Sequence, residues 1–167
     1  MMDYLIEEMT FSDWEQVANI YLEGIKTGKA TFQAEVPTWQ DWNNNHISSC
    51  RLVARSAEDV LGWCALSPTS SRSVYKGVLE VSLYIGEKYK GQGIGTTLLQ
   101  NLVKLSEENG FWTLYSAIIK ENFASILLHK KCGFREIGIR EKIAKMNNER
   151  WHDVVLMERR SKIVGVN

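Results

Sequence analysis

The chain has 167 residues, of which 44% are hydrophobic and 24% charged, a composition typical of a folded globular protein. Its 20 Lys and Arg residues balance 20 Asp and Glu residues, which argues against non-specific binding to nucleic acid or to a membrane surface. No apolar run is long enough to cross a bilayer, and the acidic start MMDYLIEEM is unlike a secretory signal. We therefore expect one domain over residues 1–167, with neither nucleic acid nor a membrane as partner.

The first part of the chain predicts a strand, two helices and a hairpin. Residues 4–9 are typical of a strand, and Ser12 with Glu15 forms a candidate capping box for a helix that runs to Gly28. The segment TWQDWNNNHISSC predicts a second helix. The strand-like segments RLVARS and VLGWCAL are joined by the acidic turn 57–59, which predicts an antiparallel hairpin.

The rest of the chain alternates strands and helices. VLEVSLYI predicts a strand, and TTLLQNLVKLSEENG predicts a helix that ends at Gly110. WTLYSAII predicts another strand, ENFASILLHKKCGF a helix that stops at Gly133, and β-rich segments follow at 134–143 and 150–158. The order β-α-α-β-β-β-α-β-α-β-β predicts an α+β (mixed α/β) protein, in which helices flank a mainly antiparallel sheet.

Residues 90–96, KGQGIGT, contain three glycines between a strand and a helix, and such a density needs a backbone reason. The dinucleotide pattern GxGxxG fails because Thr96 stands where its last glycine is required. The P-loop pattern fails because Gln92 and Gly93 stand in place of its Lys-Ser/Thr pair. A glycine-rich helix start still offers unpaired amides and a positive dipole to an anion. On this pattern alone, a phosphate site and a simple tight turn both remain open.

The segment VSLYIGEKYKGQGIGTTLL resembles the acetyl-coenzyme A motif of the GNAT superfamily of N-acetyltransferases, a bulged strand followed by Gln/Arg-x-x-Gly-x-Gly/Ala and a helix. Lys90 stands where glutamine or arginine is usual. NFASILLHKKCGF is similar to a second signature of the family, Asn-x-x-Ser before a helix that ends at Gly-Phe. The resemblance implies the GNAT fold, acetyl-coenzyme A (acetyl-CoA) as cosubstrate, and contacts to it along the strand, around the pyrophosphate and at the pantetheine arm. The implied contacts along the strand are Leu83, Tyr84 and Ile85. Those around the pyrophosphate are Lys90, Gly91, Gln92, Gly93, Ile94, Gly95 and Thr96, and those at the pantetheine arm are Asn122 and Ser125.

Acetyl transfer to an amine needs a base, because alkyl amines are largely protonated at neutral pH, and a group that assists departure of the thiolate. Glu80 opens a strand and is a candidate base if burial raises its pKa. His129 lies four residues after Ser125 on one helix face and is a candidate for thiolate departure, with Tyr115 as an alternative acid. Taken alone, each of these residues also fits a structural role. Cys132 lies at a helix end, where the dipole does not activate a thiol, so we expect no acyl-enzyme.

SRSVYKGVLEVSLYI, LLHKKCGF and ERWHDVVLMER are similar to the phosphinothricin and methionine sulfoximine N-acetyltransferases, and the likeness extends from about residue 4 to 160. It implies that Glu80 is the general base, that His129 is catalytic and that the enzyme is a homodimer. A guanidinium beside a tyrosine hydroxyl would suit a carboxylate or phosphinate. The implied substrate-binding residues are Phe32, Arg72, Tyr75 and His152.

We therefore expect a cytoplasmic enzyme that transfers acetyl from acetyl-CoA to the primary amine of a small amino-acid-like molecule. Its three cysteines show neither disulfide nor metal spacing, and no His/Asp/Glu cluster has metal spacing, so no metal is expected. Two rivals remain: an acetyltransferase for protein N-termini, lysines or polyamines, and a non-catalytic acetyl-CoA sensor.

Overall fold

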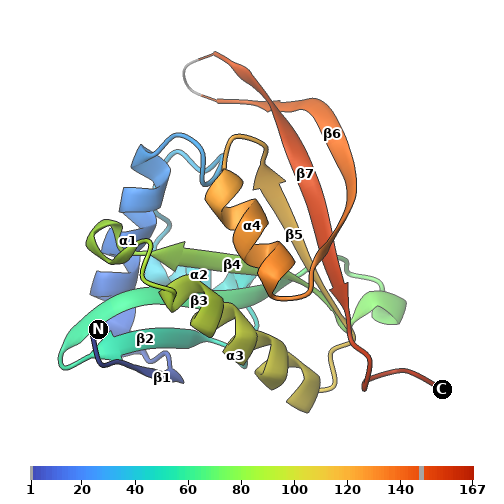
Figure 1. Cartoon of the computed structure of the whole chain (residues 1–167), viewed down its shortest axis with the longest axis horizontal. Coiled ribbons are helices and arrows are strands. Elements are labelled where there is room, and N and C mark those ends of the chain that lie inside the picture. The colour runs from blue at the N-terminus through green and yellow to red at the C-terminus, as the bar shows by residue number, and fades with distance from the viewer. Residues whose placement is uncertain (1, 147–148) are drawn as a thin grey trace.

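The computed structural model describes residues 2–146 and 149–167, and its strands form one seven-stranded sheet in the order β1-β2-β3-β4-β5-β7-β6 (Figure 1). The strands are β1 (Leu5–Glu8), β2 (Leu52–Ser56), β3 (Asp59–Pro68), β4 (Val78–Ile85), β5 (Thr113–Ile119), β6 (Arg135–Lys145) and β7 (Trp151–Arg160). Every neighbouring pair is antiparallel except β4 with β5, which is parallel. The predicted α+β arrangement around a mainly antiparallel sheet is confirmed.

Helices cover both faces of this sheet. The helices α1 (Trp14–Lys26) and α2 (Trp39–Asn45) pack on one face. On the other face lie α3 (Ile94–Glu108) and α4 (Phe123–Lys131), which are side by side in front of the sheet in Figure 1. Each face therefore buries its own apolar layer, and β3 and β4 contribute side chains to both.

The spacing of apolar residues explains which helix face is buried. Leu98, Leu99 and Leu102 of α3 are fully buried against the sheet, as the three-to-four residue repeat predicts. In α1, Val17 and Ile20 pack with the buried Trp63 of β3 on the opposite face. Full burial of one such aliphatic side chain is worth about 1.5–3 kcal/mol, so these two layers supply most of the force that holds the helices on the sheet.

The start of α1 differs from the prediction. The expected capping box of Ser12 and Glu15 is wrong, because a one-turn 3-10 helix (Phe11–Asp13) precedes α1. The Thr10 backbone N–H donates to the Asp13 carboxylate at 2.9 Å, so the carboxylate that caps the turn lies two residues before Glu15. The helix α2 begins as predicted after Thr38, whose hydroxyl accepts from the Asp41 N–H, but it is shorter than predicted.

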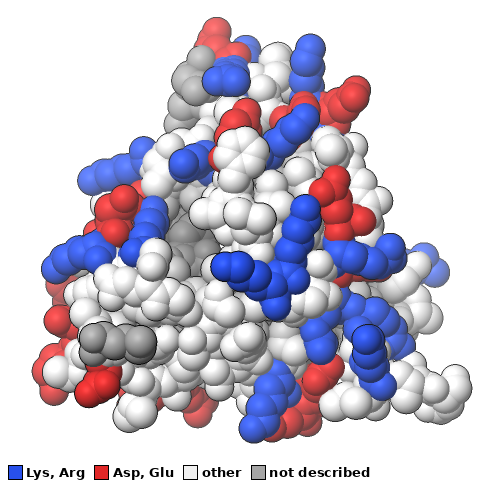
Figure 2. Space-filling view, in the orientation of Figure 1, with Lys and Arg blue, Asp and Glu red and all other residues white. Residues whose placement is uncertain are grey.

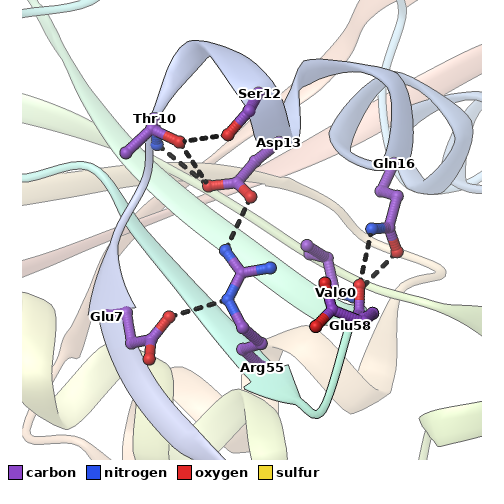
Figure 3. A network of polar contacts seen from close by, with 8 residues as sticks. All are labelled: Glu7, Thr10, Ser12, Asp13, Gln16, Arg55, Glu58 and Val60. Carbon is purple, nitrogen blue, oxygen red and sulfur yellow. Dashed lines mark hydrogen bonds and ion pairs between the residues drawn. The ribbon is translucent and has the colours of Figure 1, made fainter.

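A tertiary contact explains why Asp13 is the capping residue. Asp13 is 3% exposed, and its carboxylate accepts a hydrogen bond from Arg55 of β2 at 2.6 Å, while Arg55 also donates to Glu7 of β1 at 2.7 Å (Figure 3). Nearby, the Gln16 side chain accepts from the Val60 N–H at 2.8 Å (Figure 3). These bonds join the start of α1 to the first three strands, and a sequence window around residue 12 does not contain them.

The surface in Figure 2 shows Lys and Arg interleaved with Asp and Glu over the face that carries α3 and α4. This mixture agrees with the formal net charge of zero. Among the described helices, none has the length and apolar character needed to cross a membrane.

Candidate active site

The strands β4 and β5 pair at one end only. Their register runs from Val78 opposite Thr113 to Glu80 opposite Tyr115 and then stops, although β4 continues to Ile85. Beyond Glu80 the two strands separate, so the main chain of β4 on this side is no longer paired with β5. Backbone N–H and C=O groups need partners, and an extended ligand could supply them here.

A cavity of about 480 Å³ occupies this split. Its walls include residues 80–84 of β4, residues 116–119 of β5, one side of α4 from its cap Asn122 to His129, and the segment 30–33 that follows α1. The volume lies within the usual range for a small-molecule site. The position of the cavity follows from the sheet, because two parallel neighbours that diverge leave a gap that neither strand fills.

Side-chain alternation shows that the cavity passes through the sheet. Leu83 packs in the layer under α3, whereas Tyr84 packs in the layer under α1. By the two-residue period of a strand, Glu80 lies on the α1 side with Tyr84. Tyr115 is the register partner of Glu80, so Ser116 points to the opposite side, where it meets His129 of α4. A molecule in the split would therefore meet Glu80 from one face and Ser116 from the other.

Glu80 is half-buried at the mouth of the split, and burial raises the pKa of its carboxyl above the ordinary value. None of the ion pairs formed by the described residues involves Glu80. Burial, followed by the charge of Glu80, also raises the pKa of Tyr115. A carboxylate without a cation, facing a cavity, has the environment that a general base requires.

His129 is 3% exposed and makes hydrogen bonds from both ring nitrogens, the longest of them between Nδ1 and Ser125 Oγ at 3.4 Å. Its Nδ1 lies 2.7 Å from the Ser125 carbonyl oxygen, and its Nε2 lies 2.9 Å from Ser116 Oγ. Burial lowers the pKa of the imidazole, which favours the neutral ring. His129 thus lines the cavity and is hydrogen-bonded there to Ser116, a residue that the sequence did not indicate, and its catalytic role stays a prediction.

The three glycines of the turn have two different local settings. Gly91 and Gly93 have φ of +75° and +81°, and an added Cβ at either would meet no atom within 4 Å, so the backbone conformation alone requires glycine. An added Cβ at Gly95 would lie 2.5 Å from Leu128 Cδ1, so there the Leu128 side chain of α4 would have to move to admit any larger residue. The turn thereby opens α3 with unpaired amides, as the motif predicted.

The turn and the cavity are separate parts of the predicted cofactor site. Residues 90–96 do not line the cavity, and Lys90 forms an exposed ion pair with Glu87 at 2.6 Å. Leu83, Tyr84, Asn122 and Ser125 do line it. The Asn122 side chain also caps α4 by accepting from the Ser125 N–H at 3.3 Å.

The predicted substrate residues lie in three places. Phe32 lines the cavity. His152 is 5% exposed, its ring is 6.2 Å from that of Phe32, and its Nε2 has no hydrogen-bond partner among the described residues. Arg72 and Tyr75 lie on an exposed loop, stacked on each other at 5.4 Å, and neither lines the cavity.

Two residues near the site were missed by sequence reasoning. Ser116 is a polar residue on the strand face shared by Leu114 and Ile118, so its position in an apolar alternation was the available signal. Glu121 accepts from His152 Nδ1 at 3.3 Å, a contact across the chain that no local pattern indicates. Among the described residues, no group of three or more His, Cys, Asp or Glu side chains could hold a metal ion.

A model of the Acetyltransferase (GNAT) family matches residues 12–134. The chain belongs to the GNAT family. A phosphinothricin N-acetyltransferase from Alcaligenes faecalis is 33% identical to this GNAT chain over 155 residues, which cover 88% of the chain and 77% of the relative. An L-methionine sulfoximine/L-methionine sulfone acetyltransferase from Pseudomonas aeruginosa is 30% identical over 120 residues, covering 72% and 69%.

Solved structures give the same fold. The crystal structure of a GNAT superfamily phosphinothricin acetyltransferase from Sinorhizobium meliloti in complex with AcCoA matches with a TM-score of 0.87 at 24% identity, covering 99% of this chain and 92% of that one. The predicted GNAT fold and subfamily likeness are confirmed. The predicted class, an acetyl-CoA-dependent N-acetyltransferase, is confirmed as well.

Proposed function

We propose that this GNAT enzyme acetylates the primary amine of a small amino acid of the phosphinothricin or methionine sulfoximine type. The observation that carries the proposal is the cavity in the β4–β5 split, which is lined by the half-buried Glu80, whose carboxyl has a pKa raised by burial. Relatives named for phosphinothricin and methionine sulfoximine support this choice of substrate class.

The acetyl donor enters from the α3–α4 side. The pantetheine arm would lie against the unpaired main chain of residues 83–85, with Asn122 and Ser125 on the opposite wall. Its pyrophosphate would be held by the amides of the turn 90–96 at the start of α3. Lys90 adds charge to this turn, although Glu87 shares it.

The amine approaches from the α1 side. Glu80 accepts a proton from the ammonium, directly or through a water molecule, and the free amine then attacks the thioester carbonyl without an acyl-enzyme. Phe32 forms a wall of this half of the cavity. A raised pKa keeps the Glu80 carboxylate basic enough to take the proton at neutral pH, whereas an ordinary exposed carboxylate is a weaker base.

His152 stays a predicted contact for the polar head of the substrate; like Arg72 and Tyr75 it is not part of the cavity lining, and it lies behind Phe32, which is. The Nε2 of this buried ring has no hydrogen-bond partner within the described part of the chain, the ring centroid lies 6.2 Å from that of Phe32, and the Nδ1–H donates to Glu121, which fixes the ring orientation. Arg72 and Tyr75 stay predicted substrate contacts that are not part of the cavity lining.

The proposal is tested by a thiol-release assay with acetyl-CoA and a panel of amines. The panel holds phosphinothricin, methionine sulfoximine, methionine sulfone, common amino acids, polyamines and short peptides. Turnover confined to the tetrahedral glutamate analogues is the expected result. Turnover on peptides or polyamines alone would contradict the substrate class, and cofactor binding without any thiol release would point to a sensor.

The matched control for this assay is a pair of glutamate variants. Glu80→Gln removes the proposed base, whereas Glu136→Gln changes an exposed glutamate of β6. Loss of turnover in the first variant and its retention in the second would support the role of Glu80. Equal activity of both would remove Glu80 from the mechanism.

We also propose that the enzyme is a cytoplasmic homodimer. Three buried free cysteines support a reducing compartment. Exposed apolar side chains on the β6–β7 hairpin, namely Ile137, Ile139, Ile143 and Trp151, support an interface with a second copy. Light scattering of the wild type and of Ile139→Lys tests this, since a monomer in both would refute the dimer.

A further inference from the structure

Ser116 lies at the point where the sheet opens. It is the first residue of β5 beyond the pairing with β4, it is 2% exposed, and it lines the cavity. Its Oγ lies 2.9 Å from His129 Nε2. Among the described residues, no other serine or threonine hydroxyl forms a hydrogen bond with His129 Nε2.

The hydrogen bonds determine the direction of this contact. The Ser125 carbonyl oxygen can only accept, so the His129 Nδ1 at 2.7 Å carries the hydrogen of the neutral ring. The Nε2 is then an acceptor, and Ser116 Oγ–H donates to it. The resting site is therefore a hydroxyl aimed at an imidazole base, inside the reaction cavity.

The reaction leaves one proton to be moved after Glu80 has acted. A substrate ammonium must lose one proton before it attacks, and the nitrogen that has attacked must lose a second. The departing thiolate needs one proton. Glu80 lies on the α1 side of the split, so a separate group on the α4 side would carry the second proton to sulfur.

We propose that Ser116 is a catalytic residue that relays this second proton from the amine nitrogen to the leaving sulfur, while His129 Nε2 holds the proton that Ser116 gives up in between. The inference rests on the function proposed above and deepens it. Nitrogen and sulfur are bonded to the same carbon in the tetrahedral intermediate, so one hydroxyl at the wall of the split can reach each in turn.

The relay balances at each step. In the first step an N–H bond of the intermediate breaks, Ser116 Oγ gains that proton, and the original Oγ–H proton forms a bond to His129 Nε2. In the second step the C–S bond breaks, sulfur takes the proton from Oγ, and Oγ regains a proton from Nε2. The ring ends neutral, with Nδ1–H still bonded to the Ser125 carbonyl, and no alkoxide forms.

The surroundings of His129 suit a store that must release its proton. The ring is buried against Phe134, with centroids 4.9 Å apart, and none of the described carboxylates forms an ion pair with it. Burial disfavours the imidazolium, so the stored proton returns to Ser116 rather than remaining on the ring.

The test compares Ser116→Ala with Ser116→Thr in the thiol-release assay. The alanine variant loses the hydroxyl and should lower kcat by about 100-fold, a typical contribution of general acid–base catalysis, with the Kd for acetyl-CoA unchanged. The threonine variant keeps a hydroxyl in a strand and should retain activity within about 10-fold of wild type. A kcat for Ser116→Ala close to that of wild type would overturn the relay.

A donor with a good leaving group separates the relay from a structural role. An aryl thioacetate with a nitro group releases a thiolate that needs no proton, so the defect of Ser116→Ala should shrink with this donor. An equal defect with both donors would overturn the proposal. Absence of thiol release in the wild type with every amine would instead refute the proposed function, which makes the two failures distinguishable.

A measurement on the wild type covers the possibility that Ser116→Ala does not fold. If two protons move together in the rate-limiting step, the rate depends on the deuterium fraction of the solvent along a curve rather than a straight line. A curved dependence supports the relay, and a linear one overturns it.

Discussion

Replacement of Gly93 by alanine tests whether the turn before α3 holds the cofactor. Gly93 has φ +81°, and Gly110 at the far end of α3 has φ +80°. An added Cβ at either would meet nothing within 4 Å. The two glycines therefore form a matched pair, because alanine brings the same backbone penalty and no steric clash at both.

The penalty can be worked from the backbone conformation. A left-handed non-glycine residue costs about 1–2 kcal/mol. Gly93 lies in the turn proposed to hold the pyrophosphate, whereas Gly110 lies beyond the other end of α3, so only at Gly93 should the cost fall on cofactor binding. We expect the Kd for acetyl-CoA to rise by about 5–30-fold in Gly93→Ala. In Gly110→Ala the same cost should fall on folding and lower the Tm by up to about 2–8 °C, with the Kd unchanged.

The assay is isothermal titration of each variant with acetyl-CoA, with thermal unfolding followed in parallel. An unchanged Kd in a folded Gly93→Ala variant would refute the anion cradle and leave the simple tight turn as the reason for the glycines. An equal loss of affinity in both variants would show that backbone strain acts on the whole of α3 rather than on the turn.

Three further predictions follow from other contacts. Glu80→Gln should lower kcat/KM for the amine by about 100-fold or more. The wild-type rate should rise with pH through the raised pKa of Glu80, because only the carboxylate accepts a proton. Profiles of rate against pH for both proteins check the two predictions. Gly95→Ala should lower the Tm because its Cβ would lie 2.5 Å from Leu128 Cδ1, and Leu128→Ala in the same chain should recover part of the loss. Asp13→Ala should cost about 2–3 kcal/mol in urea unfolding, since it leaves the Arg55 guanidinium without its buried partner.

These predictions have their own controls and refutations. If the rate of Glu80→Gln still rises with pH as that of the wild type does, the titration belongs to another group. If Leu128→Ala worsens Gly95→Ala, close packing is not the cause of the instability. Glu7→Ala is the control for Asp13, because its contact with Arg55 is more exposed and should cost less than about 1 kcal/mol. Equal losses of unfolding free energy in Glu7→Ala and Asp13→Ala would show that burial does not set the relative strength of the two ion pairs of Arg55.

Local features of the chain were predictable from the sequence. The left-handed glycines at 91, 93 and 110, the hairpin around Ala57 and the strand 78–85 depend on residues within a few positions of one another. Their physical cause is the backbone freedom of glycine and the period of side chains along a strand. The family resemblance rests on the same local stretches, which is why it identified the fold and the cosubstrate, while the role of Glu80 stays a prediction.

Only the tertiary structure decided how these pieces form a site. The capping residue before α1 is Asp13 rather than the predicted Ser12, because Arg55, which is 42 residues away, supplies a partner for the Asp13 carboxylate. The pairing of β4 with β5 ends at Glu80, and this end of pairing creates the cavity. Ser116 and His129 are 13 residues apart on a strand and a helix, so no local pattern could join them. Arg72, which the resemblance assigned to substrate, lies outside the cavity lining. The sequence by itself determined conformations that each residue carries in its own backbone, whereas which side chains meet depended on packing across the sheet.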